Sequence, residues 1–539
     1  MRALEQAAVE AGTPLDELME QAGLAVAQEV WLNLGVVAGR RVLVLVGPGN
    51  NGGDGLVATR HLADWEADVC VYMLAPRDGD KNLDLVRERN VTLFSASDDA
   101  GSSRLAEALD GAEVIVDALL GTGRSRLIEG AMAEVLKRVR ARCEGDRAPK
   151  VFAVDLPTGV DADTGQADPL AVTADVTVTF GAAKVGLFTL PGSEHAGRVE
   201  VVDIRLPKAA VDALPVELVS TAWVRERLPK RPRSANKGTF GKVLVVGGSR
   251  DYVGAPRMAA EACYRAGAGL VTIASTKDVQ RANASALPEA TWVVLDGDKG
   301  SIKHGARADV ADGMQTRDVL VLGPGLGQGR GMQDFVREIL GELPDGLCGA
   351  VVDADALNAL APIDADAFHT ELRLILTPHP GEMARLLETT VEAVQRDRLG
   401  SAVDAAAKWG NIVVLKGAHT IVAAPDGRTA VSPYANALLA VAGTGDVLAG
   451  VIAGLLAQGI APFEAAACGV YVHAFAAEEL SEELGDRGLL ASELLPAIPR
   501  AMRTILHGKP SRGSGPMAGG IGDISAMLAG LGGGSAEPL

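Results

Sequence analysis

The chain has 539 residues, of which 48% are hydrophobic, so two or more domains with separate cores are expected. Its 69 acidic and 51 basic residues give a formal net charge of −18 at pH 7. This excess of acid argues against a general surface for nucleic acids or anionic membranes, so any nucleotide is expected to bind at a local site.

The cysteines and the N-terminus indicate the compartment. Five cysteines are scattered along the chain without a CxxC pair, which supports neither a disulfide framework nor a zinc site, so we expect buried thiols in a reducing environment. The N-terminal MRALEQAAVEAG is amphipathic and carries acids, unlike a signal peptide, and the longest apolar stretch, at 437–457, contains Asp446. These features predict a soluble cytoplasmic protein.

Strand-like runs alternate with Ala- and Leu-rich helical patterns along most of the chain. The first series is RVLVLV (41–46), DVCVYML (68–74), VIVDALL (114–120) and VFAVDLP (151–157). Residues 206–240 interrupt the pattern, which then restarts with KVLVVGG (242–248), VLVLGPGLG (319–327), AVVDADAL (350–357), LILTPHPGE (374–382) and IVVLKGAH (412–419). This alternation predicts two parallel α/β domains, at residues 1–215 and 216–508, followed by a flexible Gly/Ser-rich tail at 509–539.

The stretch GPGNNGGDG at 47–55 follows the first strand-like run and precedes LVATRHL, where we expect a helix to begin. Backbone N–H groups at such a turn can bind an anion, and glycines let a phosphate approach closely. A tight turn alone would also explain the glycines. The polar side chains of Asn51 and Asp54 favour a binding site.

Two further strand ends carry acids. Asp117 ends an apolar run before the turn Gly121–Gly123, and Asp155 ends another before Pro157 and Gly159. Because the carboxyl ends of parallel strands converge on one crevice, these segments and the 47–55 turn predict a composite site.

The motifs NNGGDG, DALLGTG, VDLPTGVD and TVTFGAAKVGL together resemble the NAD(P)H-hydrate epimerase family over residues 1–210. The resemblance implies a Rossmann-like three-layer domain in which Asp155 performs acid/base chemistry. It implies K⁺ ligands at Asn51, Asp117 and Thr158, the last replacing the usual serine. The implied hydrate-binding residues are Asn50, Asn51, Gly52, Gly53, Asp54, Gly121, Thr122, Gly123, Arg124, Ser125, Arg126, Leu127 and Asp155.

In the second domain, AGTGDVLAG places Gly443, Thr444 and Gly445 before Asp446 and a long small-residue helix. Helix N-terminal N–H groups can stabilise a transferring phosphoryl group, and Asp446 can accept a proton from an attacking hydroxyl. A capped buried helix would explain the acid but not both glycines. The pattern resembles the ribokinase-like superfamily.

Four neighbouring motifs, LGPGLG, VVDADALNAL, LTPHPGEMARLL and VVLKGAHTIVAAPDG, narrow the resemblance to ADP/ATP-dependent NAD(P)H-hydrate dehydratases over residues 225–508. Taken alone, His379 and Lys416 would be ordinary loop and strand-end residues. The resemblance implies hydrate contacts at Ala255, Gly325, His379 and Asp446, with Asp446 catalytic. It implies adenine-nucleotide contacts at Lys416, Gly417, Ala418, His419, Thr420 and Gly445.

The two resemblances imply one bifunctional enzyme for repairing hydrated NADH and NADPH. One half would interconvert the R and S hydrates using K⁺, and the other would dehydrate the S form using Mg²⁺ and ADP, with ATP as the alternative donor. We also expect a homo-oligomer.

The alternative is a ribokinase-like kinase of vitamins or small alcohols fused to a non-catalytic dinucleotide-binding module. The TPHPGE and KGAHT motifs argue against such a kinase, and the presence of Asn51 and Asp155 argues against a non-catalytic module.

Overall fold

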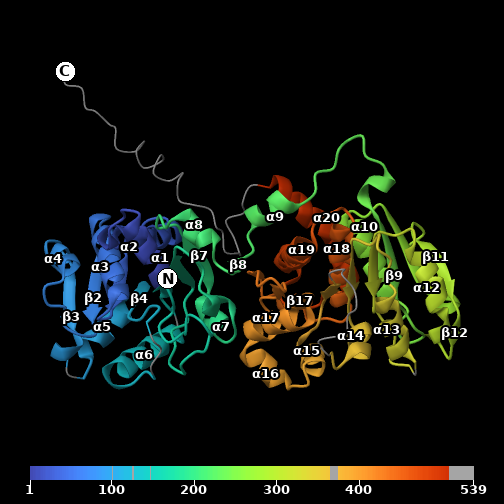
Figure 1. Cartoon of the computed structure of the whole chain (residues 1–539). Helices are drawn as coiled ribbons and strands as arrows, with labels where there is room; N and C mark the ends of the chain where they lie inside the picture. The colour runs from blue at the N-terminus through green and yellow to red at the C-terminus, as the bar shows by residue number, and fades with distance from the viewer. Residues whose placement is uncertain (100, 124–126, 146, 330, 364–373, 509–539) are drawn as a thin grey trace. The chain divides into compact units, whose positions relative to one another are not determined.

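The computed structural model describes residues 1–99, 101–123, 127–145, 147–329, 331–363 and 374–508. The chain divides into two compact units, unit 1 from Met1 to Leu214 and unit 2 beginning at Pro215 (Figure 1). Both units combine helices with a largely parallel sheet, which confirms the predicted α/β class. The tail predicted at 509–539 lies outside the described residues.

Unit 1 is built on a seven-stranded parallel sheet with strand order β3-β2-β1-β4-β5-β6-β7. The strands are β1 (Arg41–Val46), β2 (Asp68–Met73), β3 (Thr92–Ser95), β4 (Val114–Ala118), β5 (Lys150–Val154), β6 (Val176–Phe180) and β7 (Arg198–Val202). The four strand-like runs of the first series form β1, β2, β4 and β5. The order reverses direction between β1 and β4, which creates the crevice where doubly wound sheets bind ligands.

Two separate cores cover the two faces of this sheet. Val42 and Val44 of β1 pack on the side of α2 and α3, whereas Leu43 and Leu45 pack with residues of α5 and α6. The unit 1 helices are α1 (Arg2–Glu10), α2 (Leu15–Leu34), α3 (Asn50–Asp64), α4 (Lys81–Arg87), η1 (Ala96–Asp98), α5 (Ser103–Gly111), α6 (Gly130–Cys143), η2 (Val185–Phe188), α7 (Gly192–Ala196) and α8 (Lys208–Asp212). Alternate strand residues therefore face opposite helix layers.

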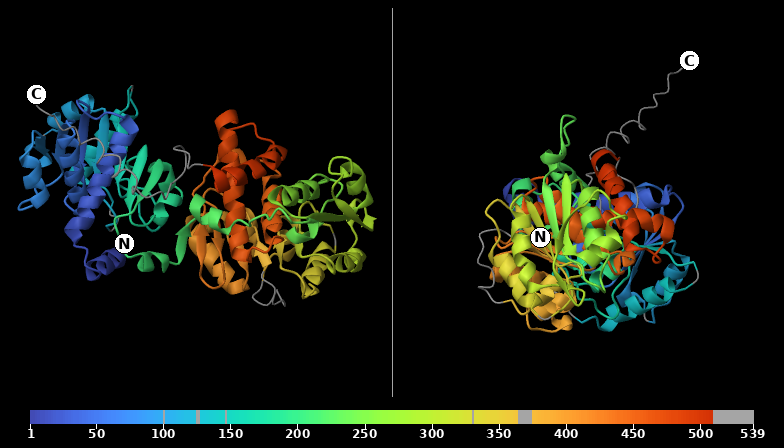
Figure 2. Two further views of the ribbon diagram at one scale, coloured as in Figure 1. Left: turned by 90° about the horizontal axis from the view of Figure 1, so that it is seen from above. Right: turned by 90° about the vertical axis from the view of Figure 1, so that its right-hand side faces the viewer.

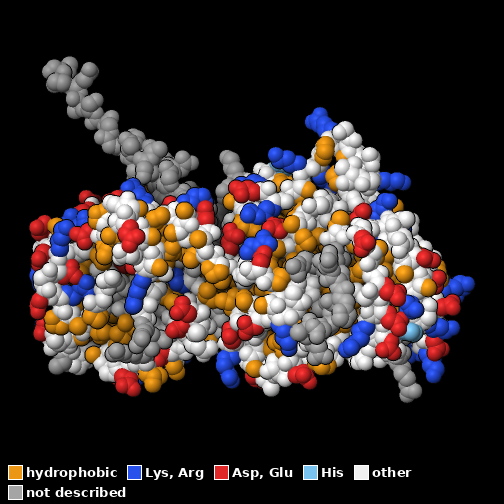
Figure 3. Space-filling model, in the orientation of Figure 1, with side chains coloured by type: hydrophobic (Ala, Val, Ile, Leu, Met, Phe, Trp, Pro, Cys, Tyr) orange, Lys and Arg blue, Asp and Glu red, His pale blue; other side chains and the backbone are white. Residues whose placement is uncertain are grey.

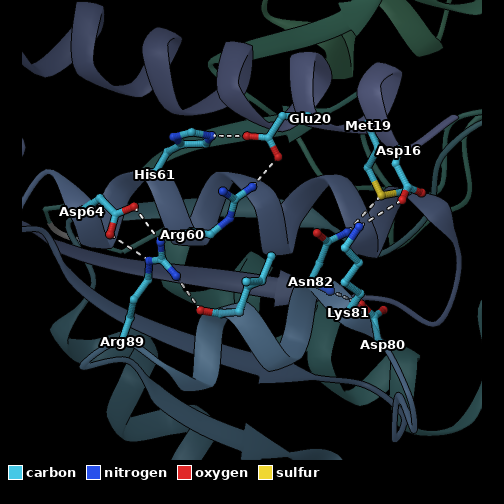
Figure 4. A network of polar contacts seen from close by, with 11 residues as sticks. Asp16, Met19, Glu20, Arg60, His61, Asp64, Asp80, Lys81, Asn82 and Arg89 are labelled. Atoms are coloured by element: carbon cyan, nitrogen blue, oxygen red, sulfur yellow. Dashed lines mark hydrogen bonds and ion pairs between the residues drawn. The ribbon is translucent and has the colours of Figure 1, made fainter. Parts of the chain in front are cut away.

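A network of charged side chains connects the helices on the outside of one layer (Figure 4). Glu20 of α2 accepts hydrogen bonds from Arg60 and His61 of α3, and Arg89 binds Asp64 at 2.7 Å. These pairs are partly exposed, so each contributes at most about 1 kcal/mol, and the apolar cores hold the layer in place.

Helix α3 begins at Asn50, so the prediction that it begins at Leu56 is wrong. The glycines permit this because the first turn lies against neighbouring backbone. A Cβ added to Gly52 would lie 2.1 Å from the carbonyl oxygen of Gly47. The NNGGD segment is therefore the first turn of the helix rather than a loop before it.

Unit 2 contains a ten-stranded sheet with order β11-β10-β9-β14-β15-β16-β17-β18-β19-β8. Strand β18 is antiparallel to both of its neighbours, β17 and β19, and the other pairs are parallel. The strands are β8 (Val216–Leu218), β9 (Lys242–Val246), β10 (Leu270–Thr276), β11 (Thr291–Leu295), β14 (Val319–Leu322), β15 (Gly349–Val352), β16 (Leu374–Leu376), β17 (Ile412–Leu415), β18 (Ile421–Ala423) and β19 (Thr429–Val431), with a separate pair β12 (Gly297–Asp298) and β13 (Ser301–Ile302).

Helices α10, α18, α19 and α20 pack on one face of this sheet around a large apolar core, as Figures 1 and 2 show. The unit 2 helices are α9 (Thr221–Arg227), η3 (Lys237–Phe240), α10 (Ala255–Ala266), α11 (Lys277–Asn283), η4 (His304–Ala306), α12 (Arg307–Met314), α13 (Met332–Gly341), α14 (Asp355–Leu360), α15 (Pro380–Leu386), α16 (Val391–Arg396), α17 (Arg398–Trp409), η5 (Ala437–Leu439), α18 (Thr444–Leu456), α19 (Pro462–Leu484) and α20 (Ala491–His507).

Helices α10 and α18 pack very closely because small residues face each other. A Cβ added to Gly450 of α18 would lie 2.2 Å from the carbonyl oxygen of Ala259, and one added to Gly454 would lie 2.6 Å from that of Cys263. No side chain larger than hydrogen fits at these two positions without moving the helices apart.

The surface carries many charged side chains. Figure 3 shows acidic and basic side chains interspersed over the visible face. None of the helices in the described ranges is long and apolar enough to cross a membrane. All five cysteines are free thiols, but Cys70 and Cys143 are half-buried and Cys348 is exposed, so the prediction of buried thiols is confirmed only for Cys263 and Cys468. Cys348 precedes β15, outside the apolar core.

We predict that Gly450→Ala destabilises unit 2 by about 1–3 kcal/mol, because the added methyl group must displace α10. Gly341→Ala is the matched control, since a Cβ there meets no atom within 4 Å. Urea unfolding of both variants measures the difference, and equal free energies of unfolding would contradict the close packing.

Candidate functional sites

A cavity of about 900 Å³ opens at the carboxyl end of the unit 1 strands. Of the residues predicted to bind the hydrate, Asn50, Asn51, Asp54, Gly121, Thr122, Gly123, Leu127 and Asp155 line it. Gly52 and Gly53 do not line it, because they face Gly47 and Met19 instead. Arg124, Ser125 and Arg126 lie outside the described residues. The cavity is large enough to enclose much of a nucleotide-sized ligand.

Below the cavity, Asp117 and Thr158 form a fully buried pair. The Thr158 hydroxyl donates to Oδ1 of Asp117 at 2.7 Å, and the Thr158 N–H donates to Oδ2 at 2.8 Å. Burial raises the pKa of Asp117 to about 6, since the described residues place no cationic side chain in contact with it. An ionised Asp117 therefore has no counter-charge among the described side chains.

Asn51 lies beside the same turn. A Cβ added to Gly121 would lie 3.0 Å from Oδ1 of Asn51, and Leu120 donates its N–H to the Thr158 hydroxyl. No described residue accepts a hydrogen bond from the buried Nδ2 atom of Asn51. The structure thus brings the three predicted K⁺ ligands to the Leu120–Gly121 turn, where, among the described residues, Asn51 forms no hydrogen bond with Asp117 or Thr158.

Asp155 follows β5 and has a positive φ of 66°. Its Oδ1 accepts hydrogen bonds from the Thr179 hydroxyl at 3.2 Å, the Phe180 N–H at 3.3 Å and Nζ of Lys184 at 2.6 Å. Sequence reasoning assigned no role to Lys184, although a lysine within the otherwise apolar FGAAKVGL was a usable signal. Left-handed backbone at a non-glycine residue persists only where the surroundings fix it.

Asp54 is a second carboxyl group on the wall of this cavity. Burial raises its pKa well above the usual range, and the charge of Asp155 adds to the effect. The cavity therefore contains two acids in different environments: Asp54 forms no ion pair with a described side chain, whereas Asp155 is paired with a lysine.

Arg77 organises the glycine turn and was also missed. Its guanidinium donates to the carbonyl oxygens of Gly47 at 2.6 Å and Gly49 at 3.0 Å and pairs with Asp80. These hydrogen bonds hold the backbone of the glycine turn in place immediately before α3.

In unit 2, three buried charged side chains meet at the carboxyl ends of adjacent strands. Nζ of Lys416, just after β17, lies 2.7 Å from Oδ1 of Asp353 and 3.8 Å from Oε2 of Glu382. The Thr377 hydroxyl also donates to Oδ1 of Asp353 at 2.7 Å. Asp353 and Glu382 lie within the sequence motifs but were given no role.

Asp446 lies in the first turn of α18, as expected from the GTGD pattern. Burial raises its pKa to about 7, and the charge of Asp353 contributes, while Lys416 opposes the shift. Gly445 adjoins the same cluster, because a Cβ there would lie 3.4 Å from Nζ of Lys416. An acid with a pKa near neutrality is suited to accept a proton at physiological pH.

The predicted hydrate contacts Ala255 and Gly325 lie together. A Cβ added to Gly325 would lie 3.0 Å from that of Ala255 and 2.6 Å from Cβ of Tyr252. His379 caps α15, with Nδ1 accepting the N–H groups of Gly381 and Glu382. This cap fixes the imidazole ring at the strand edge, and burial lowers its pKa.

The segment Lys416–Thr420 is a tight turn between β17 and β18. Gly417 has a φ of 137°, and the Thr420 hydroxyl donates to its carbonyl oxygen at 2.9 Å. Buried Arg398 donates to the carbonyl oxygens of Leu415 and Lys416, much as Arg77 does in unit 1. His419 faces inward, where burial lowers its pKa to about 4, and Ala418 is half-buried.

Buried His473 of α19 supports the GTGD turn. Its Nε2 lies 3.0 Å from the carbonyl oxygen of Thr444, and burial lowers its pKa to about 4, so it is neutral at pH 7. A neutral ring can donate one hydrogen bond to this carbonyl without adding charge beside Asp446.

Comparison with known proteins gives matches in both units. Residues 15–186 match the family model described as YjeF-related protein N-terminus, and residues 243–500 match that described as NAD(P)H-hydrate dehydratase. The chain is 41% identical to the bifunctional NAD(P)H-hydrate repair enzyme of Moorella thermoacetica, with 90% of this chain and 92% of that protein covered. It is 35% identical to the Escherichia coli enzyme of the same name, with 93% and 92% covered.

A solved structure of the Bacillus subtilis ADP/ATP-dependent NAD(P)H-hydrate dehydratase, co-crystallised with ATP/Mg²⁺, is 33% identical, covering 54% of this chain and all of that one with a TM-score of 0.48. Because these two relatives each match at least 90% of this chain, both matches extend into both units. The chain therefore belongs to the family of bifunctional NAD(P)H-hydrate repair enzymes.

Proposed function

We propose that unit 2 transfers a phosphoryl group from an adenine nucleotide to hydrated NAD(P)H and that unit 1 interconverts the two epimers of the hydrate. The observation that carries the first assignment is the position of Asp446, in the first turn of α18 beside the buried Lys416 and Asp353. The cavity that holds Asp155 and Asp54 carries the second.

Dehydration follows from the chemistry of the hydrate. Asp446 accepts the proton of the C6 hydroxyl as the hydroxyl oxygen attacks the terminal phosphorus of the nucleotide. The resulting phosphate ester is a better leaving group than hydroxide. The ring-nitrogen lone pair expels it as inorganic phosphate, and loss of a proton from C5 restores the reduced nicotinamide.

We assign nucleotide contacts to Lys416–Thr420 and Gly445, and hydrate contacts to Ala255, Gly325, His379 and Asp446. Lys416 supports this assignment because an ammonium at 2.7 Å from Asp353 stays charged and can face the phosphates. Since His419 faces inward, its part in the binding is through its backbone.

Mg²⁺ needs only one or two protein carboxylates when it binds with nucleotide phosphates. In the described residues, no group of three or more His, Cys, Asp or Glu side chains is arranged to hold a metal by itself. Asp353 and Glu382 fit the smaller requirement, and Mg²⁺ bound there would offset phosphate charge.

For epimerisation we assign proton transfer to Asp155. Its carboxylate takes the proton of the C6 hydroxyl while the C6–N1 bond breaks and N1 gains a proton, giving an aldehyde. Reclosure on either face of the planar carbonyl carbon yields either epimer. Asp54, whose pKa is raised by burial, carries a proton that N1 can receive.

We assign the remaining cavity contacts of the hydrate to Asn50, Asn51, Gly121–Gly123 and Leu127. Asn51, Asp117 and Thr158 would hold K⁺, since Asp117 is buried without a cationic partner among the described side chains. K⁺ would supply the missing positive charge below the cavity. ADP as the preferred donor, a homo-oligomeric state and a cytoplasmic location stay predictions.

We predict that Asp446→Asn lowers nucleotide-dependent repair at least about 10²-fold and leaves epimerisation unchanged, and that Asp155→Asn does the reverse. Absorbance at 340 nm measures the recovery of NADH from S hydrate, and chromatography of the R and S hydrates measures epimerisation. Loss of both activities in either variant would contradict two separate sites.

The rate of dehydration should depend on pH through Asp446. Since its pKa is about 7, the carboxyl is protonated at lower pH and cannot accept the hydroxyl proton. We predict that kcat/KM at pH 6 is about tenfold lower than at pH 8. A profile that is flat between these values would remove Asp446 as the base.

Replacing K⁺ with tetramethylammonium should reduce epimerisation and lower the Tm of unit 1, because Asp117 loses its counter-charge. Asp117→Asn should make unit 1 insensitive to this exchange, since the neutral amide needs no cation. Thermal unfolding in the two salts provides the measurement, and an unchanged salt response in Asp117→Asn would exclude this residue as a ligand.

A further inference from the structure

Lys184 is a buried cation for which the proposed reaction so far has no use. Its side chain is 5% exposed, and it follows β6 by four residues. The ammonium donates to Oδ1 of Asp155 at 2.6 Å and to the carbonyl oxygen of Phe180 at 2.9 Å. Lys184 does not itself line the cavity, but both of its partners, Asp155 and Phe180, do.

The contacts of Asp155 are strongly uneven between its two oxygens. Oδ1 accepts from Thr179, Phe180 and Lys184, whereas no described residue donates a hydrogen bond to Oδ2. The backbone is fixed as well, because the Asp155 N–H donates to the carbonyl oxygen of Val178 at 2.8 Å. The carboxyl group is thus anchored through one oxygen at the cavity wall.

The ion pair also gives the two acids of the cavity, Asp54 and Asp155, different surroundings. A buried carboxylate without a cation tends to take up a proton, as burial favours for Asp54. A short charge-assisted hydrogen bond from an ammonium instead stabilises the ionised form. Two carboxyl groups in one site with different environments can act as a base and an acid.

We propose that Lys184 is a positioning residue of the epimerase site: by binding Oδ1 of Asp155 it holds this carboxylate at the cavity wall and leaves Oδ2 to take the hydroxyl proton of the hydrate. The inference rests on the base role proposed for Asp155. It adds the reason why Asp155, rather than Asp54, is the base.

The test replaces Lys184 by Met, which keeps the length of the side chain and removes its charge. We expect Lys184→Met to lower kcat for epimerisation at pH 7 by at least about 10²-fold, with little change in KM. Lys184→Arg, which retains a cation that can bind Oδ1 of Asp155, should recover a large part of kcat.

Lys150→Met is the matched control, since Lys150 is an exposed lysine at the opposite end of β5. It should leave epimerisation unchanged, and the dehydratase activity of every variant reports the integrity of unit 2. If Lys184→Met keeps kcat, or if Lys184→Arg loses as much of kcat as Lys184→Met does, the inference about Lys184 is overturned while the role of Asp155 stands. If Asp155→Asn retains epimerisation, the proposed function of Asp155 fails instead.

Lys184→Met leaves an unpaired carboxylate in the interior, which can prevent folding. In that event, the double variant Asp155→Asn with Lys184→Met should recover the Tm of unit 1, since both charges are removed together. Failure of the double variant to recover would show that Lys184 acts as a general structural support and would overturn the inference.

Discussion

In each unit, the candidate site is built around an ion pair between a buried aspartate and a lysine. Asp155 follows β5 and pairs with Lys184 at 2.6 Å, and Asp353 follows β15 and pairs with Lys416 at 2.7 Å. Burying an isolated charge inside a protein is very unfavourable. Each aspartate and lysine can therefore be buried at the edge of the sheet only because they pair with each other. The same pairs place fixed charge where the proposed reactions move protons.

The parallel sheets explain why the charges meet. Residues far apart in sequence come together because successive strands end at the same edge, as with Asp353, Glu382 and Lys416. Near these charged groups, other side chains bind the backbone carbonyl oxygens of the turns. Arg77 and Arg398 bind the carbonyl oxygens of the two glycine-containing turns, and neutral His473 contacts that of Thr444. The turns are thereby held in place through hydrogen bonds to their backbone.

Much of this architecture could be predicted from local sequence. The strand-like runs before Asp117 and Asp155, and the helix after the GTGD turn, appear in the structure as β4, β5 and α18. The start of α3 could not be predicted, because glycine is a poor helix former and only contact with Gly47 explains its place in the first turn. Lys184, Asp353 and Arg77 were missed because their importance comes from partners 29 to 63 residues away.

Unit 1 and unit 2 each have their own sheet and their own apolar core, and every side chain of each described site comes from one unit. The two catalysts therefore do not need a shared peptide chain for their chemistry. What the fusion provides is equal supply: a single message yields one epimerase for each dehydratase, so the cell cannot make the S-specific step without also making the means to use the R form.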